Sequence, residues 1–252
     1  MLDERHEDVF RKYDNAVIEF ARKLVQIRSY SGEEEGVARL VAGKMEELGY
    51  DEVFIDAVGN VMGRIGDGPG SVLFDSHMDT VEVNDEEEWI SPPFGADIKD
   101  GRIYGRGSVD MKSSLAASLY SAVAARDLGF QDGRTIYVTA TVSEEYCDGE
   151  NLKMLFTEKG LRPDFVVICE PSNNLVTLGH KGKAQVLLRT HGVSAHGSAP
   201  EKGVNAVYEM AEIITRVEKL NDNLAALGSP HGTIVLSDIS CVSASLNAVP
   251  SE

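Results

Sequence analysis

One imidazole and five carboxylates stand at the ends of predicted strands, where side chains can do chemistry. They are His77, Asp79, Asp110, Glu144, Glu145 and Glu170. The stretch SVLFDSHMDT (71–80) is an example, because it runs apolar and then ends in the histidine and the first aspartate. The carboxyl ends of strands line the ligand crevice of an open α/β sheet. We therefore expect the six side chains to converge, although they are far apart in the sequence.

Such a cluster favours bound divalent metal. Carboxylates held close together raise one another's pKa by repulsion, and burial adds to the effect. One imidazole with several carboxylates suits zinc, cobalt or manganese better than an all-oxygen calcium site. Two ions about 3.5–4 Å apart, bridged by one carboxylate, would polarise a substrate oxygen and a water together. The sequence therefore predicts two divalent metal ions as the cofactor, with zinc preferred over cobalt or manganese.

Each motif taken alone has a simpler explanation. A single H-x-D after a strand is usually incidental, SEEYCDG (143–149) alone is an acidic turn, and NDEEEW (84–89) is a solvated loop. The turn around Gly105 and Gly107 lacks the G-K-[ST] of a phosphate loop, and no H-E-x-x-H occurs, which excludes a thermolysin-like site. Only the joint pattern of acid-bearing strand ends indicates a metal centre.

Strands that alternate with helices must position these side chains. Apolar residues at three- and four-residue steps predict a helix over 9–25, and small and apolar residues predict another over 113–128. The β-branched segments RTIYVTATVS (134–143) and DFVVICE (164–170) are typical of strands buried on both faces. This alternation indicates the α/β fold class.

Two short motifs predict local structure. SGEE (31–34) has the pattern of a capping box, in which the Ser31 hydroxyl accepts a hydrogen bond from the Glu34 amide and Glu34 reaches back. The helix that it opens would end near Gly49. DIKDGRIYG (97–105) predicts a hairpin that turns at its Asp-Gly pair.

The pattern changes near Gly179. The following segments predict a strand at 182–192, a helix at 204–220, and strands at 232–240 and 241–250. This β-α-β-β order is most of a ferredoxin-like unit, which needs one further helix and strand. We therefore expect a catalytic metal-binding domain over 1–178 and an incomplete lid or dimerisation domain over 179–252.

Composition limits the partners and the compartment. The 24 basic and 41 acidic residues give a net charge of −17, so no nucleic-acid partner is expected, because such proteins present a basic face. Cys147, Cys169 and Cys241 form no C-x-x-C pair, which indicates a reducing compartment. The charged N-terminus lacks the apolar core of a secretory signal, and no stretch approaches the roughly 18 apolar residues of a membrane span. We expect a cytoplasmic protein with no membrane partner.

The motifs together resemble the M20 metallopeptidase family, which includes acetylornithine deacetylase, succinyl-diaminopimelate desuccinylase and carboxypeptidase G2. The matching stretches cover nearly the whole chain: SHMDTV, WISPPFGADIKDGRIYGRGSVDMK, VSEEYCDG, CEPS, GVSAHGSAPEKGVNAV and LNAVP. TVSEEYCDG and HGSAPEKG are similar to a narrower branch, the selenium-metabolism-linked hydrolases. The resemblance implies a zinc-peptidase-like, three-layer α/β/α catalytic domain followed by a partial ferredoxin-like lid.

The resemblance also implies a set of metal ligands. His77 and Glu170 would bind one ion, Asp110 would bridge both ions, and Glu145 would bind the second. A cis peptide bond would follow the bridging residue, between Asp110 and Met111. The family's last ligand is a histidine near the C-terminus, and the second half of its sheet also comes from that region. Neither occurs in these 252 residues, so we expect the N-terminal portion of a longer enzyme.

The remaining site residues receive roles from the same resemblance. Asp79 would hydrogen-bond the far nitrogen of His77 and fix its tautomer. Glu144 would take a proton from the attacking water and return it to the leaving nitrogen. His196 would reach the active site of a partner subunit and stabilise the oxyanion, and Asn247 would contact the substrate.

These expectations give a leading function and an alternative. The leading function is a dinuclear-metal hydrolase that cleaves an amide or peptide bond in a small N-acyl amino acid or peptide and forms a homodimer through its lid. The alternative is a non-catalytic metal-binding or dimerisation module that is inactive without the C-terminal ligand. Glu144 beside Glu145 favours the enzyme, because a pure binding module needs no base.

Overall fold

The chain divides into two compact units in a computed structural model that describes residues 4–228 and 232–252. The units are Met1–Val176 and Thr177–Glu252. The first contains the whole predicted metal centre. The expected roles of the two parts, catalysis over 1–178 and lid or dimerisation over 179–252, stay predictions. No helix among the described residues is long and apolar enough to cross a membrane.

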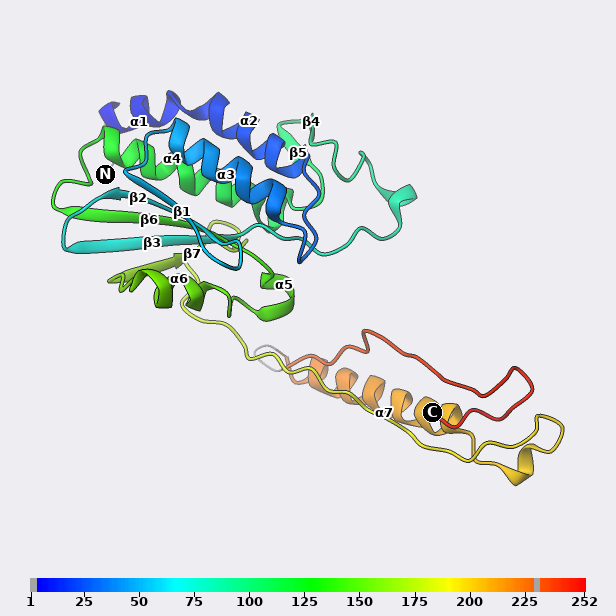
Figure 1. Cartoon of the computed structure of the whole chain (residues 1–252). Coiled ribbons are helices and arrows are strands. Elements are labelled where there is room, and N and C mark those ends of the chain that lie inside the picture. The colour runs from blue at the N-terminus through cyan, green and yellow to red at the C-terminus, as the bar shows by residue number, and fades with distance from the viewer. Residues whose placement is uncertain (1–3, 229–231) are drawn as a thin grey trace. The chain divides into compact units, whose positions relative to one another are not determined.

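The described residues of the first unit form one five-stranded sheet, one hairpin and six helices, with two further short segments (Figure 1). The helices are α1 (Glu4–Arg11), α2 (Asp14–Val25), α3 (Glu35–Glu47), α4 (Ser113–Asp127), α5 (Glu144–Cys147) and α6 (Leu152–Lys159). The sheet strands are β1 (Glu52–Ile55), β2 (Val61–Gly66), β3 (Gly70–His77), β6 (Arg134–Thr141) and β7 (Phe165–Ile168). The hairpin is β4 (Asp97–Lys99) with β5 (Arg102–Tyr104), and the short segments are η1 (Glu86–Glu88) and η2 (Ser108–Lys112).

The sheet is mixed and has the order β1-β2-β6-β3-β7. β1 and β2 pair antiparallel, and so do β2 and β6, whereas β3 runs parallel to both β6 and β7. Parallel pairing places the carboxyl ends of β3, β6 and β7 at the same end of the sheet. The sequence predicted that the acidic residues meet at this end.

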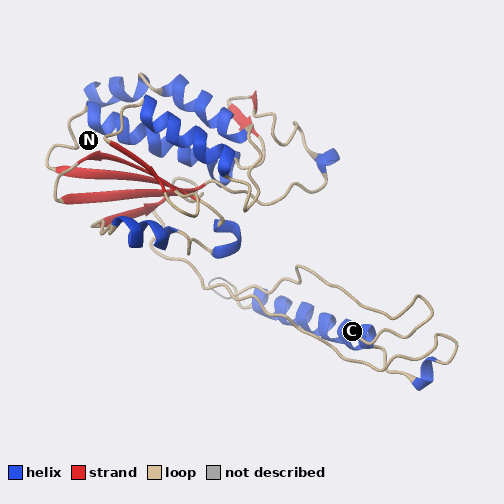
Figure 2. Cartoon of the chain, viewed as in Figure 1, coloured by secondary structure: helices blue, strands red, loops and turns tan. Residues whose placement is uncertain are grey.

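Helices cover both faces of the sheet, as Figures 1 and 2 show. Side chains of successive strand residues point to opposite faces. On β2, Val61 and Ile65 enter the larger core with α2, α3 and α4, while Met62 enters a smaller core with Leu155 of α6. The predicted α/β class and its three-layer arrangement are therefore confirmed for this unit.

The N-terminal helix expected over 9–25 forms as two helices. α1 ends at Arg11 and α2 begins at Asp14. The residues between them are tied to the end of α4, because Lys12 Nζ and Tyr13 Oη both donate to Asp127 Oδ2, at 2.8 and 2.6 Å. A tertiary contact thus interrupts a pattern that is continuous in the sequence. The expected hairpin is confirmed, with β4 and β5 joined by Asp100 and Gly101 in the left-handed region.

The expectation that the strand at 164–170 is buried on both faces is wrong for β7, which forms within it. All four of its side chains are exposed, and Phe165 is 73% exposed. The reason is its position, because β7 lies at the edge of the sheet and pairs only with β3 among the described strands.

The second unit contains one long helix and departs from the expected lid. α7 (Ala206–Ala226) confirms the predicted helix, and the Asn205 side chain caps it by accepting from Val207 N at 2.9 Å. η3 (Pro200–Lys202) precedes it. The expected strands at 182–192, 232–240 and 241–250 are not formed in the part of the chain that the structure describes, as the tan loops of Figure 2 show.

The missing strands have a physical explanation. A strand becomes stable when it has pairing partners and a covered apolar face. Apolar side chains of these segments stay in solvent instead, with Leu187 and Val235 each more than three-quarters exposed. Among the described residues of this unit only isolated bridges occur, Val193 to Val204 and His196 to Ala248. The prediction of a partial ferredoxin-like lid is therefore not confirmed.

Two glycine substitutions test the packing of α3 on the sheet. A Cβ at Gly63 would lie 2.6 Å from Met45 Sδ and 2.6 Å from the buried Tyr50 ring, whereas a Cβ at Gly43 meets nothing within 4 Å. We expect Gly63→Ala to lower the free energy of unfolding by about 1–3 kcal/mol through overpacking. Gly43→Ala, inside α3, should raise it by about 0.5–1 kcal/mol. Urea unfolding measures both, and equal midpoints for the two variants would contradict this packing.

Candidate metal centre

Three parallel strands bring the candidate ligands to one place. His77 is the last residue of β3 and pairs with Thr141, the last residue of β6. Glu144 and Glu145 begin α5 just beyond β6, and Glu170 follows β7 by two residues. Asp110 arrives from η2, directly before α4. The convergence predicted from strand ends is present.

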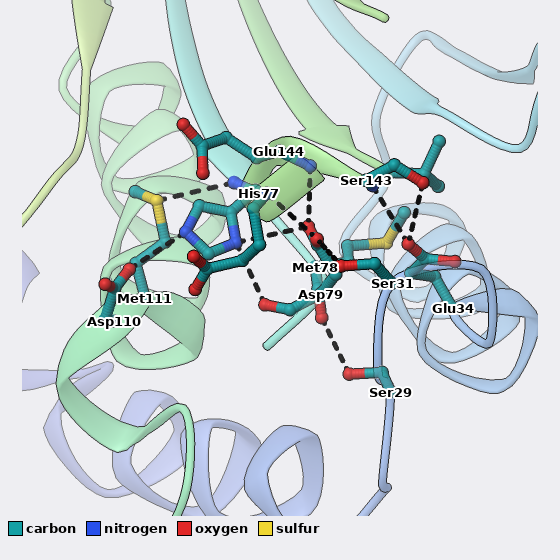
Figure 3. A network of polar contacts seen from close by, with 12 residues as sticks. Ser29, Ser31, Glu34, His77, Met78, Asp79, Asp110, Met111, Ser143 and Glu144 are labelled. Atoms are coloured by element: carbon teal, nitrogen blue, oxygen red, sulfur yellow. Dashed lines mark hydrogen bonds and ion pairs between the residues drawn. The ribbon is translucent and has the colours of Figure 1, made fainter. Parts of the chain in front are cut away.

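The distances define a compact group around His77, shown in part in Figure 3. Its Nε2 lies 2.9 Å from Asp110 Oδ1 and 3.6 Å from Glu170 Oε1. Two sets of donor atoms each lie within 4.8 Å of one another: His77 with Asp110 and Glu145, and His77 with Glu144 and Glu170. Each set could hold a metal ion, and the buried imidazole of His77 belongs to both.

The opposite nitrogen of His77 faces Asp79. Nδ1 is 2.9 Å from the Asp79 carbonyl oxygen and 3.4 Å from its carboxylate oxygen Oδ1. The carbonyl is therefore the nearer partner, and both oxygens belong to Asp79, the residue that the family resemblance implied as the partner of this nitrogen. Either oxygen can accept a hydrogen bond from the Nδ1–H group, which leaves Nε2 to face the acidic side chains.

The electrostatics of the group favour a cation. Burial alone would lower the pKa of His77, but hydrogen bonds with Asp110 and Asp79 outweigh it and raise that pKa to about 11. Burial raises the pKa of Glu170 to about 7, and nearby carboxylates add to the rise. The pKa values of Glu144 and Glu145 are raised for the same reasons. The donor set fits divalent metal, because such an ion replaces the protons that these groups otherwise hold.

The segment that carries Asp110 is fixed from several sides. Its peptide bond to Met111 is cis, as the family resemblance implied. Met111 is buried, and its sulfur lies 3.4 Å from the backbone nitrogen of His77. Lys112 is also buried and donates from Nζ to the Ile27 carbonyl at 2.7 Å.

The Asp79 carboxylate also holds the turn that begins α5. Oδ1 accepts from the Glu144 amide at 3.0 Å, and Oδ2 accepts from the Glu145 amide at 3.1 Å and from the Ser31 hydroxyl at 2.6 Å. Burial would raise the pKa of Asp79, but His77, Ser31 and the two amides together lower it. Asp79 therefore remains an anion between the imidazole and the α5 turn.

Sequence reasoning missed Ser31 and Glu34 as parts of this site. They are not a capping box: α3 begins at Glu35 without a side-chain cap, and Ser31 donates to Asp79 instead. Glu34 is buried and accepts from the Ser143 amide at 2.9 Å. The SGEE motif was the available signal, but its local pattern favoured the helix-capping interpretation.

His196 and Asn247 belong to the second unit. Their loops are neighbours, since Gly197 N donates to the Asn247 carbonyl at 2.6 Å. His196 Nδ1 lies 2.8 Å from Ser198 Oγ. The catalytic role of His196 and the substrate contact of Asn247 stay predictions.

The mixed sheet lies between helical layers, and an imidazole and several carboxylates that could hold a metal ion gather at its strand ends. A family model matches residues 73–240. The chain belongs to peptidase family M20/M25/M40.

Relatives match over most of this chain. It is 38% identical over 242 residues to an uncharacterized protein of Escherichia coli strain K12, covering 95% of this chain and 60% of that protein. It is 34% identical over 221 residues to an acetylornithine deacetylase of Proteus mirabilis, covering 82% of this chain and 56% of the relative. The chain thus spans 56–60% of the length of these two relatives.

A solved structure supports the same fold. An M20 family metallo-carboxypeptidase from Sulfolobus solfataricus superimposes with a TM-score of 0.62 at 19% identity. The match covers 94% of this chain and 68% of that one.

The protonated state of the metal-free site predicts pH-dependent metal binding. His77, with a pKa of about 11, and Glu170, with a pKa of about 7, must lose protons when zinc binds. Zinc affinity should therefore rise between about pH 6 and pH 8. Titration against a chromophoric chelator measures the affinity, and calorimetry in two buffers of different ionisation enthalpy counts the protons. An affinity independent of pH would contradict this electrostatic picture.

Stability without metal should fall as the pH rises. The folded-state pKa of Glu170 is about 7 against an ordinary 4.5, so its stabilising contribution is full below the ordinary value and is lost as the pH rises through the folded one. Thermal melts in chelator between about pH 5 and pH 8 should show a smaller fall in Tm for Glu170→Gln than for the unchanged protein. Saturating zinc should raise the Tm of the unchanged protein at the upper pH. If the Tm of both proteins fell equally with pH, the raised pKa of Glu170 would be contradicted.

Proposed function

We propose that this chain carries the metal-binding part of a hydrolase that cleaves an amide or peptide bond in a small N-acyl amino acid or peptide. The observation that carries the proposal is the meeting of His77, at the end of β3, with carboxylates that follow β6 and β7 and with Asp110 of η2. Family membership supports the reaction class. Curated relatives named acetylornithine deacetylase and succinyl-diaminopimelate desuccinylase favour an N-acyl amino acid as the substrate.

Two divalent ions, with zinc preferred over cobalt or manganese, would occupy the site. His77 and Glu170 would hold one, Glu145 the other, and Asp110 both, an assignment supported by the contacts of His77 with Asp110 and Glu170. When bound, such ions polarise the scissile carbonyl and make water a better nucleophile. Asp79 would keep the imidazole oriented through its contacts with Nδ1.

Glu144 is the proposed general base. Burial and the nearby Asp79 and Asp110 raise its pKa, which brings it closer to neutrality. Its carboxylate would take a proton from the attacking water and deliver it to the leaving nitrogen. Its backbone is fixed by the hydrogen bond from its amide to Asp79, so the side chain starts from a defined position.

The second unit would complete the site in a homodimer. His196 would stabilise the oxyanion in the partner subunit's site, and Asn247 would contact the substrate. Support for both roles comes from the family motifs GVSAHGSAP and LNAVP and from the adjacency of the two loops. The expected division into a catalytic part over 1–178 and a lid or dimerisation part over 179–252 belongs to the same proposal.

Replacing the base tests the mechanism. In the complete gene product, Glu144→Gln should lower kcat by about 10²- to 10⁴-fold, the usual contribution of general acid–base catalysis. Zinc content should stay unchanged, because the proposal gives Glu144 no ligand role. Turnover is measured on a panel of N-acyl amino acids and dipeptides, and metal content by elemental analysis.

A surface glutamate provides the matched control. Glu150 forms an exposed ion pair with Lys153, so Glu150→Gln should leave turnover and zinc content unchanged. Turnover retained in Glu144→Gln would contradict the assignment of the base. Zinc lost from Glu144→Gln would instead identify Glu144 as a ligand, as its grouping with His77 and Glu170 allows.

A further inference from the structure

We infer that Glu34 is a positioning residue for the metal centre: its buried carboxylate sets the turn that presents Glu144 and Glu145. The inference rests on the proposed function, since it assigns Glu34 to the same site. Glu34 touches neither His77 nor any proposed ligand side chain through a hydrogen bond in the described residues. Its effect would pass through the backbone of Ser143.

The contacts of Glu34 converge on one oxygen. Oε1 accepts from the Ser143 amide at 2.9 Å and from the Gly32 amide at 3.0 Å, and the Ser143 hydroxyl lies 3.4 Å away. Figure 3 shows Glu34 facing Ser143 on the side of Asp79 away from the imidazole. Glu34 is only 5% exposed. A buried carboxylate that accepts backbone amides is a strong, fixed contact.

Ser143 is the residue whose conformation needs such a contact. Its φ is +54°, in the left-handed region that serine rarely adopts. It lies between the end of β6 and the first residue of α5, so its backbone angles set the direction in which Glu144 and Glu145 leave the sheet. Holding its amide fixes that direction.

Two buried carboxylates together hold three consecutive amides. Glu34 accepts a hydrogen bond from the amide of Ser143, and Asp79 accepts hydrogen bonds from the amides of Glu144 and Glu145. α5 is only four residues long, so it has almost no internal hydrogen bonds with which to hold itself. The position of both glutamates therefore depends on these two acceptors.

The loop that carries Glu34 is itself held by hydrogen bonds. The loop before α3 is attached to the end of β3, because Ser29 Oγ donates to the Met78 carbonyl at 2.7 Å and Tyr30 forms a bridge with Thr80. Ser31 adds its hydrogen bond to Asp79. Glu34 thus connects the α5 turn to the same strand that ends in His77.

Three substitutions separate position from charge. Glu34→Gln keeps the length and an oxygen that can accept both amides, but it loses the charge. Glu34→Asp keeps the charge but is one methylene too short to reach the Ser143 amide. Glu34→Ala removes the acceptor. If Glu34 acts by position, the zinc affinity of Glu34→Gln should stay close to that of the unchanged protein. Glu34→Asp and Glu34→Ala should both bind zinc more weakly.

Zinc affinity and amide exchange are the readouts, since neither requires turnover. Zinc affinity, from chelator competition on the complete gene product, should fall by about 10- to 100-fold in Glu34→Ala and Glu34→Asp, the usual range for groups that orient ligands. Hydrogen exchange at residues 143–145 in metal-free protein should be faster in the same two variants. Glu35→Ala is the matched control, because Glu35 is adjacent and exposed and, among the described residues, pairs with Arg39 on the surface of α3.

Unchanged zinc affinity and unchanged exchange in Glu34→Ala would overturn the inference. Reduced zinc affinity in Glu34→Gln together with unchanged affinity in Glu34→Asp would also overturn it, because the charge of Glu34 and not its position would then matter. If Glu34→Ala does not fold, the Gln and Asp variants still separate the two explanations. Failure of the proposed function looks different: the unchanged protein would bind no zinc, or Glu144→Gln would keep its turnover, while the exchange result at 143–145 would still report on Glu34.

Discussion

The buried carboxylate of Asp79 is the contact on which the site depends. It accepts hydrogen bonds from the Ser31 hydroxyl and from the amides of Glu144 and Glu145, and it borders the ring of His77. These donors belong to three different segments, the loop before α3, the turn into α5 and the end of β3. Because Asp79 stays ionised inside the protein, none of the three can move without leaving a buried charge partly unpaired.

Parallel pairing is the second constraint, and it explains why much of the site could be predicted from the sequence. β3, β6 and β7 each end in or just before a polar residue, and parallel strands bring such ends together whatever their separation in the chain. His77, Glu144 and Glu170 meet for this reason. Runs of apolar and β-branched residues identified the strands, and the sequence order of strands and helices was enough for the α/β class.

The remaining features depend on contacts that no local pattern contains. Ser31 and Glu34 match a capping box, but their partners Asp79 and Ser143 lie 48 and 109 residues away, and these contacts outcompeted the helix cap. In the second unit, the segments 182–192, 232–240 and 241–250 predicted strands that do not form in the described residues. The composition of a segment shows that it can pair, while pairing itself requires a partner strand and a covered face. Leu187 and the other apolar side chains there remain in solvent.

The exposed strand β7 has a consequence for how the chain behaves at high concentration. Among the described residues no strand pairs with its outer edge, so main-chain donors and acceptors lie open there beside four exposed apolar side chains. An edge of this kind is a template for strand addition by another molecule, which is the first step of aggregation. Because Glu170 follows β7 by two residues, intermolecular pairing there would also disturb the acidic group at the strand ends.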